Sequence, residues 1–289
     1  MNGLRQRLWG AAGYCRSNPK LLIAVSILLA LVLFHVIGSL VVDPGRADPL
    51  SGAPCQPPSL EYLLGTDFAG RQLMEVMIVG MGLTLRIGVQ AALIGLVIGT
   101  FLGFVSGFYG GRLDTVIKGA ADVLIPLPSL IVLVVIAAMI PGVITLEYMV
   151  LVVGGLSWMW PTRVIRAQVL SMREKAYIQV ARLSGMNNLE VIFKEMMPNL
   201  LPFLGASFVG TTAAAVLATI GLEALGLGPQ HLPTLGMTIH WAIVRGAVFL
   251  GMWWWWMPPI VIIVVLFVGL FLLTIGLDEI ANPRLKETT

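Results

Sequence analysis

Long apolar runs separated by short polar segments dominate the pattern of this chain. A membrane-spanning helix needs about 20 apolar residues. Six stretches approach that length and predict about six transmembrane helices, at 21–42, 87–108, 123–140, 148–162, 200–222 and 252–277. Residues 73–85 are also apolar, and we expect a helix at the membrane surface that leads into the second span, with a seventh crossing as the alternative.

Composition agrees with the pattern. The 289 residues are 57% hydrophobic and 11% charged, whereas a soluble chain carries about 25% charged residues. The first run is too long for a secretory signal and lacks a small-residue cleavage site, so we expect an uncleaved span. Cys15 and Cys55 lie on opposite sides of that span and predict no disulfide.

Basic residues are distributed unevenly between the two sides. With six spans and an internal N-terminus, 14 of the 18 Lys and Arg residues lie inside. Four lie outside: Arg46, Arg71, Arg86 and Arg245. The positive-inside rule therefore predicts that both termini are cytoplasmic.

The second span carries a ladder of small residues, Gly95, Gly99, Gly103 and Gly107. Such a stripe lets another helix approach closely in lipid. It indicates either packing within this chain or a crossing with a partner subunit. Prolines at 126, 128 and 161 interrupt the following spans, which suits backbone that faces protein or a watery cavity.

A polar insert, "KAYIQVARLSGMNNLEVIFKEMMPNLLP", stands between two apolar stretches at 175–202. The pattern predicts a short amphipathic helix over 175–184 that stops at Gly185. Asn187 is a candidate N-cap, with Glu190 three residues later as in a capping box. A second helix over 189–196 should end before Pro198. The insert is either a capped connection or a knob that docks in a groove of a soluble partner.

This insert resembles the cytoplasmic loop of inner-membrane permeases of binding-protein-dependent ABC importers. Gln179, Val180 and Ala181 stand at that family's Glu-Ala-Ala, Gly185 at its glycine, and Met197-Pro198 at its Leu-Pro. The spacing is kept throughout. Gln179 replaces the acidic residue and Glu195 an isoleucine-like one; these departures would re-tune the contact but keep the helix–Gly–helix architecture.

Other segments resemble the oligopeptide/dipeptide/nickel branch of the same family, and the second of its two related pore proteins. "LGTDFAGRQ" keeps that branch's Gly-Thr-Asp-x-x-Gly-Arg through Asp67, Gly70 and Arg71. "GFYGGRLD", "ADVLIPLPSL", "LGLGPQ" and "NPRLK" follow in the branch's order.

The resemblance implies an all-α polytopic permease of a type I ABC importer. Its expected organisation is a cytoplasmic N-terminus at 1–20, a first transmembrane helix at 21–42, an outer loop with an interfacial helix at 43–86, a permease core at 87–277 with a coupling loop at 170–199, and a cytoplasmic tail at 278–289. Tyr177, Gln179, Val180, Ala181, Gly185, Met197 and Pro198 would form the ATPase contact, and Asp67, Gly70 and Arg71 the outer segment.

The implied partners are a second homologous permease, two cytoplasmic ATPase subunits and an extracytoplasmic substrate-binding protein. ATP and Mg²⁺ would bind to the ATPases, with no cofactor in this chain. None of its lysines precedes Ser or Thr, so the chain lacks the lysine signature of a phosphate-cradling loop. It is expected to be no enzyme. His-Glu-x-x-His and Cys/His spacings are absent from the sequence, which predicts no metal site.

The substrate stays open between oligopeptides and oligosaccharides. The branch's Pro-x-Pro-Glu-Trp-Gly is not kept here, and four tryptophans, Trp253, Trp254, Trp255 and Trp256, precede the last span. They fit an interfacial anchor, and one or two rings could instead line the outer mouth of the pathway.

Three other interpretations remain. A secondary transporter would need coupling-ion carboxylates or broken helices near mid-membrane and no ATPase. An intramembrane enzyme would need a convergent catalytic set, and a scaffold subunit would tolerate changes in the insert. Co-purification with ATPases distinguishes the importer from all three.

Overall fold

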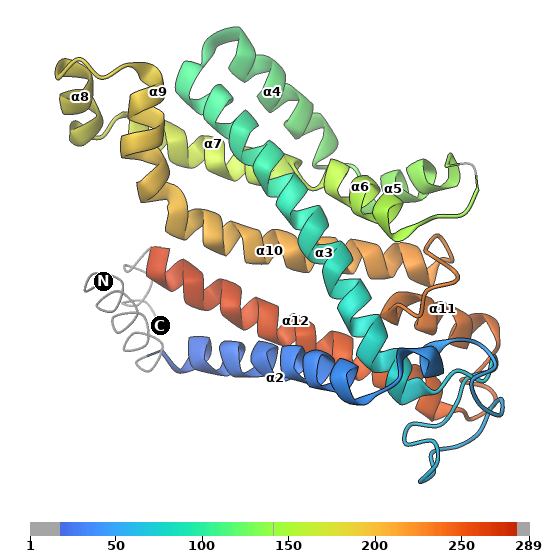
Figure 1. Ribbon diagram of the computed structural model, residues 1–289. Coiled ribbons are helices and arrows are strands. Elements are labelled where there is room, and N and C mark those ends of the chain that lie inside the picture. Colours follow the sequence, from blue (N-terminus) through green and yellow to red (C-terminus); the bar gives the residue numbers. More distant parts are fainter. Residues whose placement is uncertain (1–17, 141, 282–289) are drawn as a thin grey trace. The chain divides into compact units, whose positions relative to one another are not determined.

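A computed structural model describes residues 18–140 and 142–281 of the chain (Figure 1). The regular structure of these residues is helical. The chain divides into two compact units, Met1–Leu83 with Leu232–Thr289, and Thr84–His231, and each is described by itself. The predicted terminal segments 1–20 and 278–289 lie mostly outside the described residues.

Within the described ranges, four helical runs are long and apolar enough to cross a membrane. They are Pro19–Val41, Leu73–Tyr109, Asn188–Ala224 and Trp253–Glu279. A fifth results if two helices joined by an 89° bend, Gly111–Leu124 and Ser129–Ala138, form one broken span. The all-α polytopic prediction is confirmed. The crossing expected at 148–162 is divided between two shorter helices.

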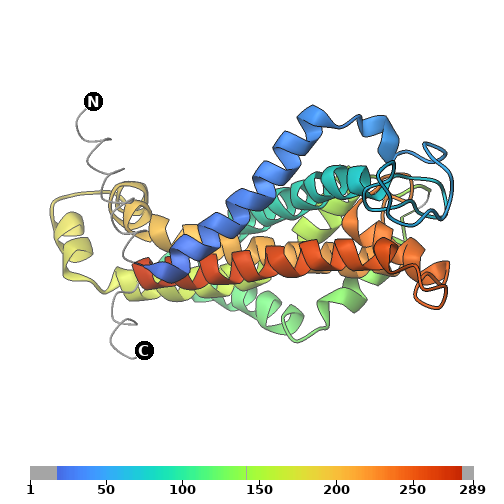
Figure 2. The same cartoon turned by 90° about the horizontal axis from the view of Figure 1, so that it is seen from below.

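The first unit is built on two long helices, α2 (Pro19–Val41) and α12 (Trp253–Ala281). They pack closely because Gly269 and Gly276 of α12 lie against Leu28 and Leu21 of α2. Figure 2 shows the two helices adjacent where α2 begins and diverging along its length. Glu279 fixes the adjacent ends, since it accepts hydrogen bonds from Asn18 at 2.6 Å and Lys20 at 3.1 Å.

The same unit contains the 43–72 segment, the start of α3 (Leu73–Phe104) and the short helices η1 (Pro44–Ala47) and α11 (Leu235–Val244). The helix expected at 73–85 is not separate, because α3 runs without a break from Leu73 into the predicted second span. Its apolar residues are continuous with those of the span, and no proline or cap interrupts them. The start of α3 contacts α2 through His35, whose Nδ1 lies 2.7 Å from the Ile78 carbonyl oxygen.

The second unit contains the rest of α3 and seven further α-helices. They are α4 (Gly111–Leu124), α5 (Ser129–Ala138), α6 (Leu146–Leu156), α7 (Met159–Arg173), α8 (Ala176–Leu183), α9 (Asn188–Glu190) and α10 (Met197–Ala224). Two π-helical segments, η2 (Val105–Tyr109) and η3 (Val191–Met196), follow α3 and precede α10. The predicted break at Pro126 and Pro128 is confirmed, because it separates α4 from α5, and proline has no N–H to continue a helix.

The glycine ladder of α3 packs within this unit. Gly95 lies against Ser157, and the other three glycines lie against α7. A Cβ at Gly103 would approach Ile165 Cβ to 3.0 Å, and one at Gly107 would approach the Arg166 carbonyl oxygen to 3.0 Å. The ladder therefore serves contacts inside this chain.

Candidate functional site

The helix–Gly–helix element, residues 175–198, begins with α8. At the end of α8 the N–H of Gly185 donates to the Arg182 carbonyl at 3.0 Å, and the N–H of Met186 donates to the Ala181 carbonyl at 3.2 Å. This pair of bonds is a Schellman motif, which needs a left-handed residue after the helix. Gly185 supplies it with φ of +86°. The predicted stop at Gly185 is confirmed.

The predicted capping box after the bend is also confirmed. The Asn187 side chain accepts from the N–H of Glu190 at 2.9 Å, and the Glu190 carboxylate accepts from the N–H of Asn187 at 3.1 Å. Lys194 donates to the same carboxylate at 2.9 Å. Local side chains therefore fix the direction in which the chain leaves the bend.

The predicted end of the second helix before Pro198 is wrong. α9, η3 and α10 form one helical run, Asn188–Ala224, which changes direction between the parts labelled α9 and α10 in Figure 1. Met197 N–H donates to Ile192, five residues back. The wider π turn continues the backbone bonding up to Pro198, which has no N–H of its own to donate.

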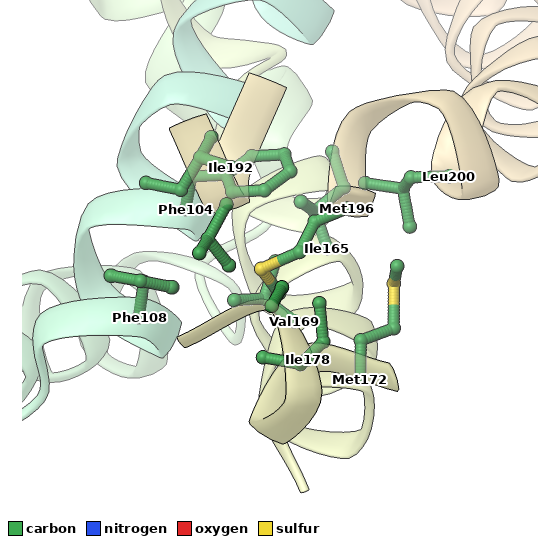
Figure 3. Packing of buried hydrophobic residues seen from close by; sticks show 11 residues of the cluster. Phe104, Phe108, Ile165, Val169, Met172, Ile178, Ile192, Met196 and Leu200 are labelled. Carbon is green, nitrogen blue, oxygen red and sulfur yellow. The ribbon is translucent and has the colours of Figure 1, made fainter. Parts of the chain in front are cut away.

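A cluster of buried apolar side chains anchors α8 (Figure 3). Ile178 is fully buried and Ala181 is 6% exposed. They share the cluster with Phe104, Phe108, Ile165, Val169, Met172, Val191, Ile192, Met196 and Leu200, from the ends of α3 and α10, from α7, and from η2 and η3. A displacement of α8 must therefore move or deform the ends of these helices, because close-packed interiors transmit strain.

Cations reinforce the attachment of this cluster. The Arg182 guanidinium lies 5.2 Å from the centre of the Phe108 ring, and Arg173 donates to the Phe108 carbonyl at 3.3 Å. On the neighbouring helices, Arg166 of α7 donates to Asp114 of α4, with 2.6 Å between Nη2 and Oδ2, and Ser106 donates to the same carboxylate. A planar arginine fork matches a carboxylate in two places, which fixes orientation.

Several apolar side chains of the element are exposed, beside polar ones such as Gln179 and Arg182. Val180 is 60% exposed, Leu183 is 88%, Leu189 is 61% and Phe193 is 63%. Val180 and Leu183 are three residues apart in α8 and therefore lie on one face of this helix, which makes that face a candidate interaction surface. Chemically, this face can bury apolar area against a partner while the cluster holds the element from behind.

The structure places the predicted coupling residues in three settings. Tyr177, Gln179 and Val180 are exposed on α8, whereas Ala181 faces the cluster. Gly185 lies at the bend, where an added Cβ would meet none of the described residues within 4 Å. Met197 and Pro198 do not belong to a loop, because they form the first turn of α10.

The two departures from the family motif lie at the surface. Gln179 is exposed, and Glu195 is half-buried near Tyr177. Burial raises the pKa of the Tyr177 hydroxyl, and the Glu195 charge raises it further. Tyr177 therefore stays neutral and able to donate at physiological pH.

The predicted outer segment forms a compact turn. The Asp67 carboxylate accepts from the N–H groups of Ala69 and Arg71, each at 2.8 Å. Gly70 has φ of +76°, and a Cβ there would overlap the Gly52 carbonyl oxygen. Burial raises the pKa of Asp67, and these backbone donors and the Arg71 charge oppose that rise.

The four tryptophans have different surroundings. Trp255 is 1% exposed and Trp253 is 50% exposed. Trp254 donates to the Thr66 carbonyl at 3.4 Å, and Trp256 is half-buried. They do not form a single aromatic surface. In the described part of the chain, no group of three or more His, Cys, Asp or Glu side chains could hold a metal ion.

Sequence reasoning missed the supporting residues of the site. Phe104 and Phe108 lie in the predicted span 87–108, and Ile165 and Val169 lie just after the one at 148–162. Nothing in the local sequence distinguishes these four from lipid-facing residues. The pair of Asp114 and Arg166 could have been suspected, because both charges lie close to apolar stretches, where a charge is costly unless it is paired.

Comparisons with known proteins show the family of this chain. The family described as binding-protein-dependent transport system inner membrane component matches residues 95–287. The oligopeptide transport system permease protein OppC of Mycobacterium tuberculosis is 32% identical over 210 residues, 72% of each chain. The dipeptide transport system permease protein DppC of Bacillus subtilis is 28% identical over 277 residues, 94% of this chain and 84% of that protein.

Proposed function

Because this chain belongs to the family of binding-protein-dependent transport system inner membrane components, it is a permease subunit of an ABC importer, and we propose that its helix–Gly–helix element couples ATPase subunits to a peptide pathway. The chain is a multi-pass membrane protein and a transport component. The finer roles below are our proposal.

One observation carries the coupling role. The element exposes Val180 and Leu183 on one side, while Ile178 on the other side is buried in the cluster that joins α3, α7 and α10. A partner that grips the exposed face and moves would displace the buried face with it. Helices α3 and α10 belong to runs of 37 residues each, long enough to carry such a movement across a bilayer.

The partner on this face would be a cytoplasmic ATPase that binds ATP and Mg²⁺. The positive-inside distribution supports a cytoplasmic location for the element and for both termini. The absence of a phosphate-loop lysine from the sequence supports hydrolysis on separate subunits. An extracytoplasmic binding protein would deliver the substrate, as the family description suggests, and a second permease would complete the complex.

Peptides are the substrate class that we propose. The relatives are named for oligopeptide and dipeptide transport. The oligosaccharide alternative depended on the tryptophans as a stacking surface, yet Trp255 is buried and Trp254 is bonded to Thr66. The contacts of Trp254 and Trp255 therefore give little support to an outer mouth in which tryptophan rings stack against sugars.

Reconstituted complexes test the coupling role through two changes at Gly185. Gly185→Arg should lower peptide uptake at least ten-fold, with either lost ATPase subunits or hydrolysis uncoupled from transport. Gly185→Asn is the matched control, because asparagine tolerates the left-handed conformation and a Cβ at this position would meet no atom of the described residues within 4 Å. Uptake that survives Gly185→Arg in a folded, inserted complex would reduce the element to a connector.

A further inference from the structure

Helices α4 and α5 lead from one end of the long helices of the second unit toward the other. At the start of α4, Asp114 accepts a hydrogen bond from Ser106 in η2, which contributes to the cluster that joins the end of α3 to the start of α10. Beyond the bend, Leu130 of α5 lies against Gly221 of α10, and Figure 1 shows α5 beside the C-terminal end of α10. Gly221 is about 36 Å along α10 from the first residue of this helix. The two helices together therefore cross the membrane as one broken span.

Two charged residues of α4 lie within this crossing. Lys118 and Asp122 follow Asp114 by about 6 and 12 Å along the helix, and both are exposed on the surface of the chain. The ion pair that ties α4 to α7 joins Asp114 to Arg166 and uses neither of them. A charge at membrane depth is costly in lipid, so such residues face protein or a water-filled space.

The exposed surface of α4 is divided into a polar and an apolar face. Thr115, Lys118 and Asp122 are spaced by three and four residues, so their side chains share one face. Val116 and Val123 are 70% and 68% exposed and lie about a third of a turn further round the helix. Lipid or an apolar partner helix can cover the valine face. Neither of these can cover the polar face without leaving its charges unpaired.

The bend after α4 adds backbone acceptors at the same depth. Pro126 has no N–H to donate to the Asp122 carbonyl, and the N–H of Leu127 donates to the Leu124 carbonyl at 3.1 Å instead of to that of Val123. The carbonyls of Asp122 and Val123 thus lose their usual helical donors. Backbone of this kind is tolerated at membrane depth where it is buried in protein or lines a water-filled cavity.

We propose that the polar face of α4, formed by Thr115, Lys118 and Asp122, lines the water-filled pathway through which the peptide crosses the membrane. Water solvates charges of both signs and free carbonyls at once, whereas a second permease packed on this face would need a matching partner for each of them. A peptide carries an ammonium and a carboxylate, and the face offers one charge of each sign. Contacts of this kind suit passage, which needs binding weak enough to be released. The inference rests on the proposed function, from which it takes the peptide as the transported solute.

The test measures how fast single cysteines in α4 react with a membrane-impermeant, positively charged methanethiosulfonate. It uses the complete complex in lipid nanodiscs, nucleotide-free and ATP-bound, with the two native cysteines of this chain replaced by serine. In at least one of these states, Thr115→Cys and Asp122→Cys should each react about ten-fold faster than their neighbours Val116→Cys and Val123→Cys, because only a hydrated thiol ionises and meets the reagent. The valines are matched controls, since they are exposed at the same depth of the same helix.

Uptake by proteoliposomes then asks whether the hydrated face belongs to the pathway. The bulky adduct at Thr115→Cys, a variant that keeps Lys118 and Asp122, should lower peptide uptake about ten-fold. Asp122→Leu should lower it by a similar factor and Asp122→Asn by less than about three-fold, because asparagine keeps a polar lining.

Three results would overturn the proposal. Slow reaction at all four positions would mean that the second permease covers the polar face. Equally fast reaction at all four would place the whole of α4 in water, outside the wall of a pathway. Fast reaction at the polar face with uptake unchanged by the adduct would place the water elsewhere. Thiol reactivity does not depend on the ATPase contact, so failure here leaves the coupling role of the Gly185 region standing, and the reverse holds.

Discussion

The helix–Gly–helix element and the 43–72 segment use glycine and burial in opposite ways. Gly185 and Gly70 both have positive φ, yet an added Cβ at Gly185 would meet none of the described residues within 4 Å, whereas one at Gly70 would overlap the Gly52 carbonyl oxygen. The element turns apolar side chains outward and satisfies its polar groups locally, whereas the 43–72 segment buries Thr66, Asp67 and Arg71. The first therefore exposes apolar area to a partner, and the second buries its polar groups within the turn.

Among the substitutions that test this comparison, Gly70→Ala is expected to have the largest effect on stability. An L-residue in the left-handed region costs about 1–2 kcal/mol, and the new Cβ would also overlap the Gly52 carbonyl oxygen. We expect the free energy of unfolding of the first unit to fall by about 3 kcal/mol or more. The rate of limited proteolysis within residues 43–72 would measure this loss of stability. Gly185→Ala, which meets no overlap, should cost only about 1–2 kcal/mol, and equal costs would refute the distinction.

A smaller effect is expected when the anchor of α8 is truncated. Ile178→Ala removes buried methyl groups from the cluster and should destabilise the docked element by about 2–4 kcal/mol. Val180→Ala, on the exposed face of the same helix, should change stability by less than about 0.5 kcal/mol. Hydrogen exchange of the α8 amides would report both. Similar protection in the two variants would show that α8 is not held by its buried face.

The smallest effect is expected in the pH dependence of the stability of the 43–72 segment. Burial raises the pKa of Asp67 above its ordinary 3.8, so the folded segment binds that proton more tightly than the unfolded one. Its contribution to stability is therefore present at acidic pH and lost as pH rises through the folded-state pKa. In thermal unfolding from pH 4 to 7, the stability of wild type should fall relative to that of Asp67→Asn. A difference that is constant or rises with pH would contradict the burial account.

Local signals predicted the site better than they predicted the spans. Gly185 and the Asn187–Glu190 box were readable because each acts within a few residues. The local signal at Pro198 gave a wrong prediction. A proline usually ends a helix, but here a π turn continues the backbone hydrogen bonds up to it. The surroundings of Arg71 could not be predicted from the sequence, because Trp241 and Trp255 come near it only through the fold of the first unit.

The central claim is that a cytoplasmic ATPase grips the exposed face of α8, and site-specific photocrosslinking tests it most directly. A photoreactive residue at Val180 of the active complex should crosslink to an ATPase subunit, and the same residue at Thr115, exposed on α4, should not. Transport-active complexes that crosslink to an ATPase at neither position, or equally at both, would contradict the account.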